Sequence, residues 1–217
     1  EYTANSPIYS HWLPLFTVLF GTGCRIGEVI GLRWDDLDYE NREISINHAV
    51  IYRVMENGKA EFHVSTPKTK AGKRKIPMME AVYQAFRDEY EAQKESGFNI
   101  EICDGMSGFV FANRNGGLHN PANINRAIRR IYEAYNAEEI IKAKKEKRVP
   151  ILIPHFSCHH MRHTFCTRLC EVEENIKVAQ DIMGHADVST TLNIYAEASD
   201  TAKLQAVNNM QKIFDIF

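Results

Sequence analysis

The pattern of hydrophobic positions begins with helices. Residues 8–20 are mostly apolar and predict a helix, in which Pro14 marks a kink or an early boundary. Two glycines interrupt this pattern, and a short helix is predicted at about 25–31. The chain therefore opens with two helices of different length.

Alternation with period two then indicates strands. Ile44, Ile46 and His48 alternate with polar neighbours, which predicts a strand over 43–50. A hairpin-like turn with a second strand follows, and then a basic turn with a third short strand that ends near residue 78. We expect the three strands to form one small antiparallel sheet.

Helical periodicity returns after the strands. An amphipathic helix ends at Gly97, an irregular segment covers 99–120, and a long helix is predicted from Pro121 to about residue 146. Ser157 is a suitable N-cap for a helix over 158–172. Three shorter helices fit residues 175–183, 188–197 and 200–214. The predicted fold class is mainly α (α+β), a helical domain with a small three-stranded antiparallel sheet.

Composition excludes some classes of protein. The 217 residues are 44% hydrophobic and 25% charged, as in ordinary globular proteins. No run of 18 apolar residues and no signal peptide is present, so we expect a cytoplasmic protein without membrane contact. The five cysteines have no framework spacing, which indicates reduced thiols.

Charge is concentrated locally. The net charge is −2, which does not indicate nucleic-acid binding by the chain as a whole. Residues 66–77 nevertheless hold five cations and no anion, and residues 142–148 hold five cations and one anion. Such patches are solvated surface or contact phosphates.

The segment 157–170 carries the densest candidate chemistry. Its predicted helix has an apolar stripe formed by Met161, Phe165, Leu169 and Val172. His159 and Arg162, spaced i and i+3, lie at the edge of this stripe and suit an oxyanion. The alternative is that Arg162 pairs with an acid and His159 packs or caps.

A metal site is a further alternative at the same helix. Cys158, His159, His163 and Cys166 are ligand types for zinc. Their spacing matches no zinc motif, and no second cysteine pair lies at a suitable distance. We therefore predict no metal site.

Two further segments carry isolated candidates. Arg25 follows two glycines at a predicted helix start, and Glu28 is placed to orient its guanidinium. The alternative is an exposed ion pair. Tyr195 shares a helical face with Val188, Thr191 and Leu192, so it is either a core residue or a nucleophile in a strongly positive field.

The order of these motifs is more specific than any one of them. "TGCRIGEVIGLRWDDLD", a hairpin lysine, "HHMRHTF" and "MGHADVSTTLNIY" resemble the catalytic domain of the tyrosine recombinases, the phage-integrase family. The resemblance spans residues 25–195, and the basic hairpin and the insert at 98–153 are most similar to integrases of conjugative transposons. It implies a DNA strand transferase that integrates and excises a mobile element through a 3′-phosphotyrosyl intermediate.

The resemblance implies a role for each matching residue. Arg25 and Arg162 would bind the scissile phosphate, and His185 would hydrogen-bond to it. His159 would assist proton transfer at Tyr195, which would attack phosphorus. A lysine of the hairpin would protonate the leaving 5′-oxygen; we expect Lys68, with Lys70 as the alternative. Glu28 fills a structural acidic position, and the cations expected to contact DNA are Lys70, Lys73, Arg74 and Lys75.

The resemblance also implies partners and limits. We expect double-stranded DNA at recombination sites, a homo-tetramer on DNA, accessory excision or DNA-bending proteins, and no cofactor or metal. Residues 1–217 are expected to be a catalytic domain that lacks core-binding and arm-binding domains, with a C-terminal exchange helix at about 203–217. The competing hypotheses are a type IB topoisomerase and a non-catalytic DNA-binding or assembly module.

Overall fold

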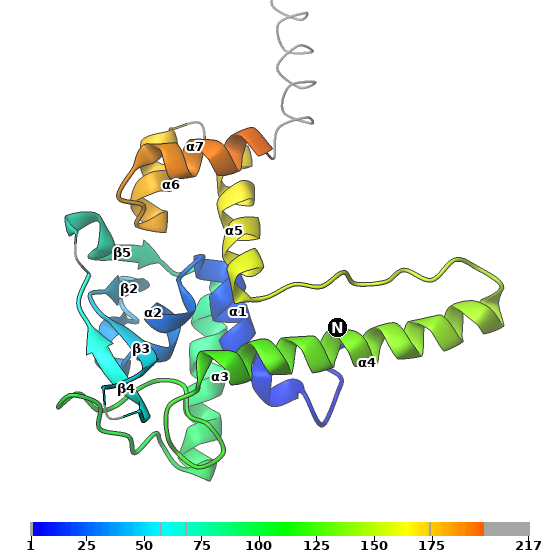
Figure 1. Ribbon diagram of the computed structural model, residues 1–217, viewed down its shortest axis with the longest axis horizontal. Coiled ribbons are helices and arrows are strands. Elements are labelled where there is room, and N and C mark those ends of the chain that lie inside the picture. The colour runs from blue at the N-terminus through cyan, green and yellow to red at the C-terminus, as the bar shows by residue number, and fades with distance from the viewer. Residues whose placement is uncertain (1, 57, 68, 174, 198–217) are drawn as a thin grey trace, which may run out of the picture.

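The protein is mainly helical with a small amount of antiparallel sheet, as predicted (Figure 1). The computed structural model describes residues 2–56, 58–67, 69–173 and 175–197. Its α-helices are α1 Leu13–Thr22, α2 Ile26–Gly31, α3 Glu80–Ser96, α4 Pro121–Glu146, α5 Cys158–Val172, α6 Ile176–Met183 and α7 Val188–Glu197. Short 3-10 turns cover Ser10–Trp12, Trp34–Asp36 and Lys70–Gly72.

Most helix boundaries follow local sequence signals. α4 begins at Pro121, where the side chain of Asn120 accepts a hydrogen bond from the backbone N–H of Ala122. α5 follows Ser157, and α3 stops before Gly97, as predicted. α1 begins at residue 13 instead of 8, because proline is favoured in the first helical turn. The helix predicted over 200–214 lies outside the described residues.

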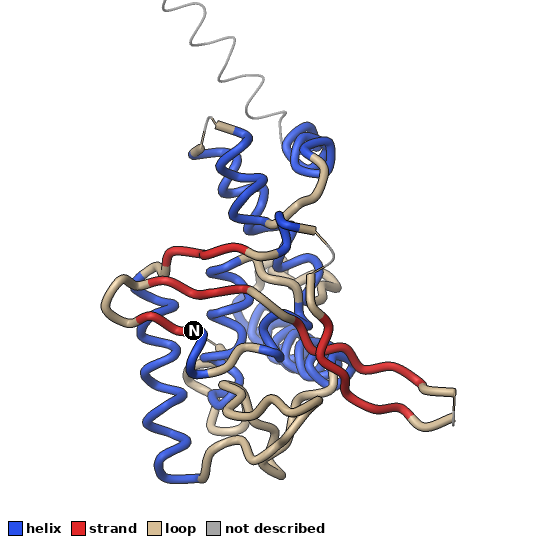
Figure 2. The backbone as a smooth tube through the Cα atoms, turned by 90° about the vertical axis from the view of Figure 1, so that its left-hand side faces the viewer, coloured by secondary structure: helices blue, strands red, loops and turns tan. Residues whose placement is uncertain are grey.

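The strands differ from the prediction in their grouping (Figure 2). The three-stranded sheet consists of β1 Leu37–Asp38, β2 Glu43–Ile46 and β5 Arg74–Pro77, while β3 Ala49–Val54 and β4 Ala60–Ser65 form a separate hairpin. The strand predicted over 43–50 is therefore two strands. The chain leaves the first ladder because Asn47 donates to Asp36 and the ring of His48 donates to the carbonyl of Gly31.

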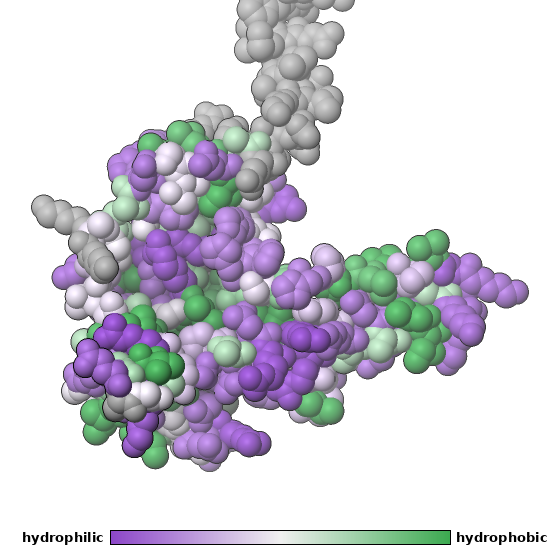
Figure 3. Space-filling model, in the orientation of Figure 1, coloured by the Kyte–Doolittle hydropathy of each residue, from purple (hydrophilic) through white to green (hydrophobic). Residues whose placement is uncertain are grey.

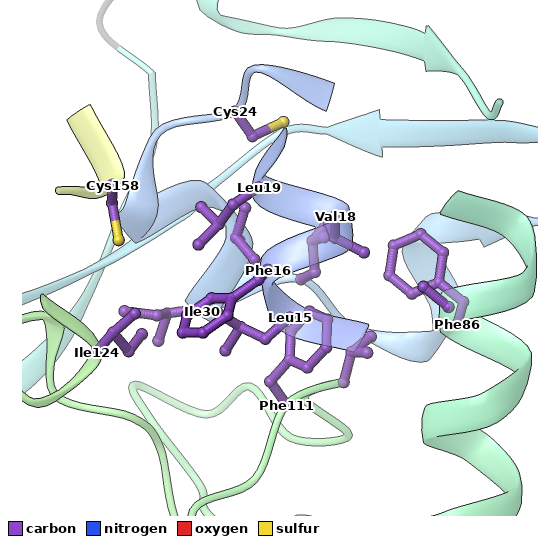
Figure 4. Packing of buried hydrophobic residues seen from close by; sticks show 14 of the residues in the cluster. Leu15, Phe16, Val18, Leu19, Cys24, Ile30, Phe86, Phe111, Ile124 and Cys158 are labelled. Atoms are coloured by element: carbon purple, nitrogen blue, oxygen red, sulfur yellow. The ribbon is translucent and has the colours of Figure 1, made fainter. Parts of the chain in front are cut away.

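The main core surrounds α1 (Figure 4). Leu15, Val18 and Leu19 of α1 are buried, and Phe86 of α3 and Ile124 of α4 belong to the same cluster. All three strands of the sheet contribute to this core. Ile44 of β2 faces Ile76 of β5, and both are buried in the cluster together with Leu37 of β1 and Ile46 of β2. The body is thus a helical core with the sheet packed beside it.

A second, smaller core joins α5, α6 and α7. It contains Cys166, Cys170, Ala179, Met183 and Ile194, from α5, α6 and α7. The predicted apolar stripe of α5 is wrong at its end, since Val172 is 81% exposed. The buried positions of α5 are spaced mainly four apart, at Cys158, Met161, Arg162, Cys166 and Cys170. An arginine thus occupies the apolar face of this helix.

The second half of α4 projects from the body, and the connector to α5 runs back beside it (Figure 1). The amide of Asn136 exchanges two hydrogen bonds of 2.8 Å with the backbone of Ile153. Glu139 pairs with Arg148 and accepts from the backbone of Ile151. Aliphatic residues here stay exposed (Figure 3): Ile140, Ile141, Val149, Ile151 and Leu152.

All five cysteines lie within the described part of the chain. Each is a buried free thiol. Among the described helices, none combines the length and the apolar character that crossing a membrane requires.

The turn after α1 depends on a glycine. Gly23 has φ +62°, and a Cβ added there would lie 2.3 Å from the ring of Phe165 on α5. Gly58 also has a positive φ, +76°, but a Cβ there would meet nothing within 4 Å. An alanine at Gly58 would suffer only the strain of the left-handed backbone, whereas an alanine at Gly23 would suffer this strain and a clash with Phe165.

We predict that Gly23→Ala destabilises the fold more than Gly58→Ala. The left-handed backbone costs an alanine about 1–2 kcal/mol at either position, and overpacking adds about 1–3 kcal/mol at Gly23. The measurement is the free energy of unfolding by urea denaturation. Equal losses in the two variants would show that Phe165 moves aside without cost.

Candidate active site

Arg25 is fixed at the start of α2. It is the N-cap residue, with extended backbone angles, and its N–H donates to Oε2 of Glu28 at 2.8 Å. Its Nη1 donates to Oε1 of the same carboxylate at 2.9 Å. The orientation of Arg25 by Glu28 that the spacing indicates is therefore present. The Arg25 side chain stays 48% exposed, so its guanidinium remains accessible.

Arg162 is buried on α5, and within the described part of the chain its hydrogen bonds go to backbone carbonyls and to no acidic side chain. Its Nη1 donates to the carbonyl of Gly23 at 2.5 Å, and its Nη2 donates to the carbonyl of Met183 at 2.7 Å. Burial, together with the nearby charge of Arg25, lowers its pKa to about 10. The guanidinium is thus still charged at neutral pH, and its positive charge is held by neutral carbonyls.

The C-terminal end of α6 brings three arginines together. The carbonyl of Ile182 accepts from Nε of Arg74 at 2.7 Å, and the carbonyl of Met183 accepts from Arg162 at 2.7 Å. The carbonyl of Gly184 accepts from Nη2 of Arg25 at 3.3 Å. The last carbonyls of a helix lack partners within the helix and form the negative end of its dipole. They therefore attract guanidinium groups from α2, α5 and β5 to one place.

His185 directly follows these carbonyls and is buried. Its backbone N–H donates to the carbonyl of Gln180, and its Nδ1 lies 2.9 Å from Oγ1 of Thr191 on α7. Burial and the charges of Arg162, Arg25 and Arg74 lower its pKa to about 4. His185 is therefore a neutral imidazole beside several positive charges.

His159 and Arg162, predicted to act together, differ in their exposure. Its side chain is exposed on the first turn of α5, and its Nε2 lies 2.7 Å from Nε2 of His163. Arg162 is instead buried one turn further along the helix. The two residues thus share a helix, and their action on a common oxyanion stays a prediction.

The alternative of a metal site on α5 lacks support in the geometry. The thiols of Cys158 and Cys166 are buried in two different hydrophobic clusters. Within the described ranges, no group of three or more His, Cys, Asp or Glu residues is arranged to hold a metal ion.

Of the remaining predicted residues, the structure describes Lys73 and Lys75 in full and Tyr195 and Lys70 only by their backbone. Tyr195 lies on α7, one helix after His185, but its side chain and that of Lys70 are outside the description, as is all of Lys68. Lys73 is exposed, and Lys75 is exposed beside Glu43, which accepts its hydrogen bond at 2.7 Å.

Arg74 is expected at a DNA-contacting surface, but its side chain is only 5% exposed. Strand alternation explains this, because Arg74 shares a face of β5 with the buried Ile76. Its Nη1 and Nη2 donate to the two carboxylate oxygens of Glu28 at 3.0 and 2.9 Å. Sequence reasoning missed this pair, although the alternation in "RKIP" was a signal that could have revealed it.

Glu28 is the central anion of the site. Burial opposes its ionisation, but the hydrogen bonds and charges of Arg74 and Arg25 outweigh this and hold its pKa below the ordinary value. One ionised carboxylate therefore faces three guanidinium groups, those of Arg25, Arg74 and Arg162. The site carries a net positive charge and is suited to an anion.

Known proteins are similar to this chain in sequence and in fold. The phage integrase family matches residues 1–202. The chain is 37% identical over 195 residues to the transposase from transposon Tn916 of Enterococcus faecalis, covering 90% of this chain and 44% of that protein. It is 26% identical over 207 residues to a XerC-like tyrosine recombinase of Caldanaerobacter subterraneus, covering 92% and 49%.

Solved structures agree with these sequence matches. The Tn1549 transposon integrase in complex with a circular intermediate DNA superposes with a TM-score of 0.79 at 32% identity, covering 96% of this chain and 61% of that chain. The XerA recombinase has the same fold, with a TM-score of 0.63. The chain spans about half the length of the curated relatives it matches. From its sequence and its fold, the chain belongs to the phage integrase family of tyrosine recombinases.

Proposed function

We propose that the chain is the catalytic part of a site-specific DNA recombinase that integrates and excises a mobile element. The observation that carries this proposal is the meeting of Arg25 and Arg162 on adjacent carbonyls of one helix end. Phosphoryl transfer requires mainly positioning and positive charge at the equatorial oxygens of the phosphate. Two fixed guanidinium groups with no competing acid on Arg162 supply both.

The reaction is a transesterification at one phosphodiester. The hydroxyl oxygen of Tyr195 bonds to phosphorus while the bond from phosphorus to the 5′-oxygen breaks, leaving a 3′-phosphotyrosyl enzyme. His159 takes the proton of the tyrosine hydroxyl, and Lys68 gives a proton to the leaving 5′-oxygen. Because the covalent intermediate keeps the phosphodiester energy, a 5′-hydroxyl of another strand reverses the step without ATP.

His185 contributes a hydrogen bond to the phosphate without a charge of its own. When the hydroxyl of Thr191 donates to Nδ1, the proton of the neutral ring resides on Nε2, which is then a donor. Its low pKa, about 4, keeps this neutral form at physiological pH.

The reaction we propose needs no divalent ion. The two arginines neutralise the phosphate charge, a task that metal ions perform in other phosphoryl-transfer enzymes. The proposed partner is double-stranded DNA at recombination sites, bound by a tetramer of this protein with accessory excision or DNA-bending proteins. The Tn1549 integrase has been solved with DNA, which supports the partner class.

We expect Tyr195→Phe to form no covalent adduct with a nicked suicide substrate, from which the cleaved fragment diffuses away. The phenylalanine lacks the attacking oxygen but keeps the ring. Tyr90→Phe on α3 is the matched control and should form the adduct like the unchanged protein. Adduct is measured by denaturing gel, with and without EDTA. An adduct formed by Tyr195→Phe would contradict the role of Tyr195 as the nucleophile. Loss of the adduct of the unchanged protein in EDTA would contradict a reaction without a divalent ion.

We predict that a 5′-bridging sulfur in the substrate restores cleavage by Lys68→Ala. A thiolate leaves without protonation, so a lost general acid no longer matters. Lys70→Ala serves as the comparison, and the measurement is the single-turnover cleavage rate on oxygen and sulfur substrates. Rescue of Lys70→Ala instead would move the role to Lys70, and rescue of neither would remove it from this segment.

We expect His185 to titrate near pH 4 in the free protein, followed by NMR of its ring carbons. The folded pKa lies below the ordinary value of about 6.5. The unfolded chain therefore binds the proton first, and stability falls as the pH drops from about 6.5 toward 4. Bound DNA should raise this pKa, because the phosphate offsets the arginine charges. A free-protein value of 6.5 or above would show that the imidazole is not enclosed by the arginines.

A further inference from the structure

Arg74 uses its whole hydrogen-bonding capacity within the protein. Its Nε donates to Ile182, and its Nη1 donates to Glu28 and, at 3.5 Å, to the carbonyl of Gly72. Its Nη2 donates to Glu28 and to Sγ of Cys24 at 3.7 Å. A guanidinium has five N–H donors, so none is left over. With the side chain only 5% exposed, Arg74 is not available to bind a DNA phosphate.

The end of α6 is shaped to accept Arg74. Gly184 has φ +63°, and a Cβ added there would lie 2.8 Å from Nη1 of Arg74 and 3.0 Å from the carbonyl of Ala71. The absence of a side chain at Gly184 therefore allows the helix end, the turn before β5 and the guanidinium to approach one another. This ties the segment that carries the candidate lysines to the segment that carries His185.

Charge balance gives this contact a consequence for the reaction. Glu28 accepts hydrogen bonds from both Arg25 and Arg74. Arg74 cancels the single negative charge of Glu28, so the charges of Arg25 and Arg162 remain available to a phosphate. Without Arg74, Glu28 and Arg25 would form a neutral pair, and the site would lose half of that positive charge.

We propose that Arg74 is a positioning residue of the recombinase site: it neutralises Glu28 and fixes the end of α6. Arg25 then stays oriented toward the scissile phosphate, and Glu28 does not compensate its positive charge. This inference rests on the proposed function, because it assigns Arg74 a part in the same cleavage step.

The test replaces Arg74 with methionine, alone and together with Glu28→Gln. We expect Arg74→Met to lower the single-turnover cleavage rate at saturating DNA about 10- to 100-fold, as expected when catalytic groups are displaced. DNA affinity, measured in a Tyr195→Phe background, should change little. Adding Glu28→Gln removes the uncompensated negative charge and should restore the rate several-fold.

One further variant separates the charge of Arg74 from its hydrogen-bonding geometry, and a second pair of residues provides the control. Arg74→Lys keeps the positive charge but loses the planar set of N–H donors that bind Glu28 and Ile182 together. Its cleavage rate should lie between those of the unchanged protein and Arg74→Met. The matched control is the exposed pair on α4, Arg129 with Glu133, which lies outside the site. Arg129→Met and its double variant with Glu133→Gln should cleave like the unchanged protein. Urea denaturation of every variant confirms that the compared proteins are folded.

Two outcomes would overturn the inference. If the double variant is no faster than Arg74→Met, the loss is structural and the charge of Glu28 has no part in it. The other outcome is that Arg74→Met weakens DNA binding but leaves the cleavage rate at saturating DNA unchanged. If the slope of log affinity against log salt concentration also falls by the amount of one phosphate contact, Arg74 binds DNA directly.

An NMR titration of the Glu28 carboxyl tests the inference without relying on cleavage. Three cations face this carboxylate: Arg25 from α2, Arg74 from β5 and Arg162 from α5. We expect its pKa to lie below the ordinary value in the unchanged protein and to rise in Arg74→Met. If the unchanged protein forms no adduct, the proposed function fails and the titration alone decides the role of Arg74. An unchanged pKa contradicts that role even in an active enzyme.

Discussion

Three successive backbone carbonyls at the end of α6, each bound by a different arginine, hold the site together. They belong to Ile182, Met183 and Gly184. A short helix offers unpaired carbonyls at this end in any protein, and the negative end of its dipole favours cations. Here the cations come from α2, α5 and β5, elements widely separated in sequence. The geometry of the site therefore depends on main-chain atoms, which no substitution can remove directly.

The arrangement places like charges close together before any ligand arrives. Burial and neighbouring arginines lower the pKa of Arg162 to about 10 and that of His185 to about 4. Both shifts mean that positive charge is disfavoured there in the free protein. A phosphodiester would reverse this, because its negative charge relieves the repulsion. The negative charge of Glu28 offsets part of this repulsion.

Sequence reasoning succeeded where the determining interactions are local. Pro121 marks a helix start through its fixed φ, and Ser157 does so as an N-cap residue. The pairing of Arg25 with Glu28 follows from their separation of three residues at the start of one helix. Helical spacing predicts Arg162 at the edge of the apolar stripe, which indicates partial burial but not the full burial that the structure shows. Its carbonyl partners come from distant segments, which no local pattern reveals.

Predictions failed where a tertiary contact decides the outcome. The strand over 43–50 divides because Asn47 and His48 bind partners outside the sheet. Arg74 was grouped with surface lysines by composition, although the alternation of β5 places it inward with Ile76. Its partner Glu28 lies 46 residues earlier in the chain, beyond the reach of any periodicity.

The buried cysteines have a practical consequence for work on this protein. Burial raises the pKa of Cys24 to about 11 and that of Cys158 and Cys166 to about 12, so these thiols stay protonated at neutral pH. Maleimides and similar reagents attack thiolates. A cysteine introduced at an exposed position would therefore react selectively, and fluorophores or cross-linkers can be attached without first removing the native cysteines.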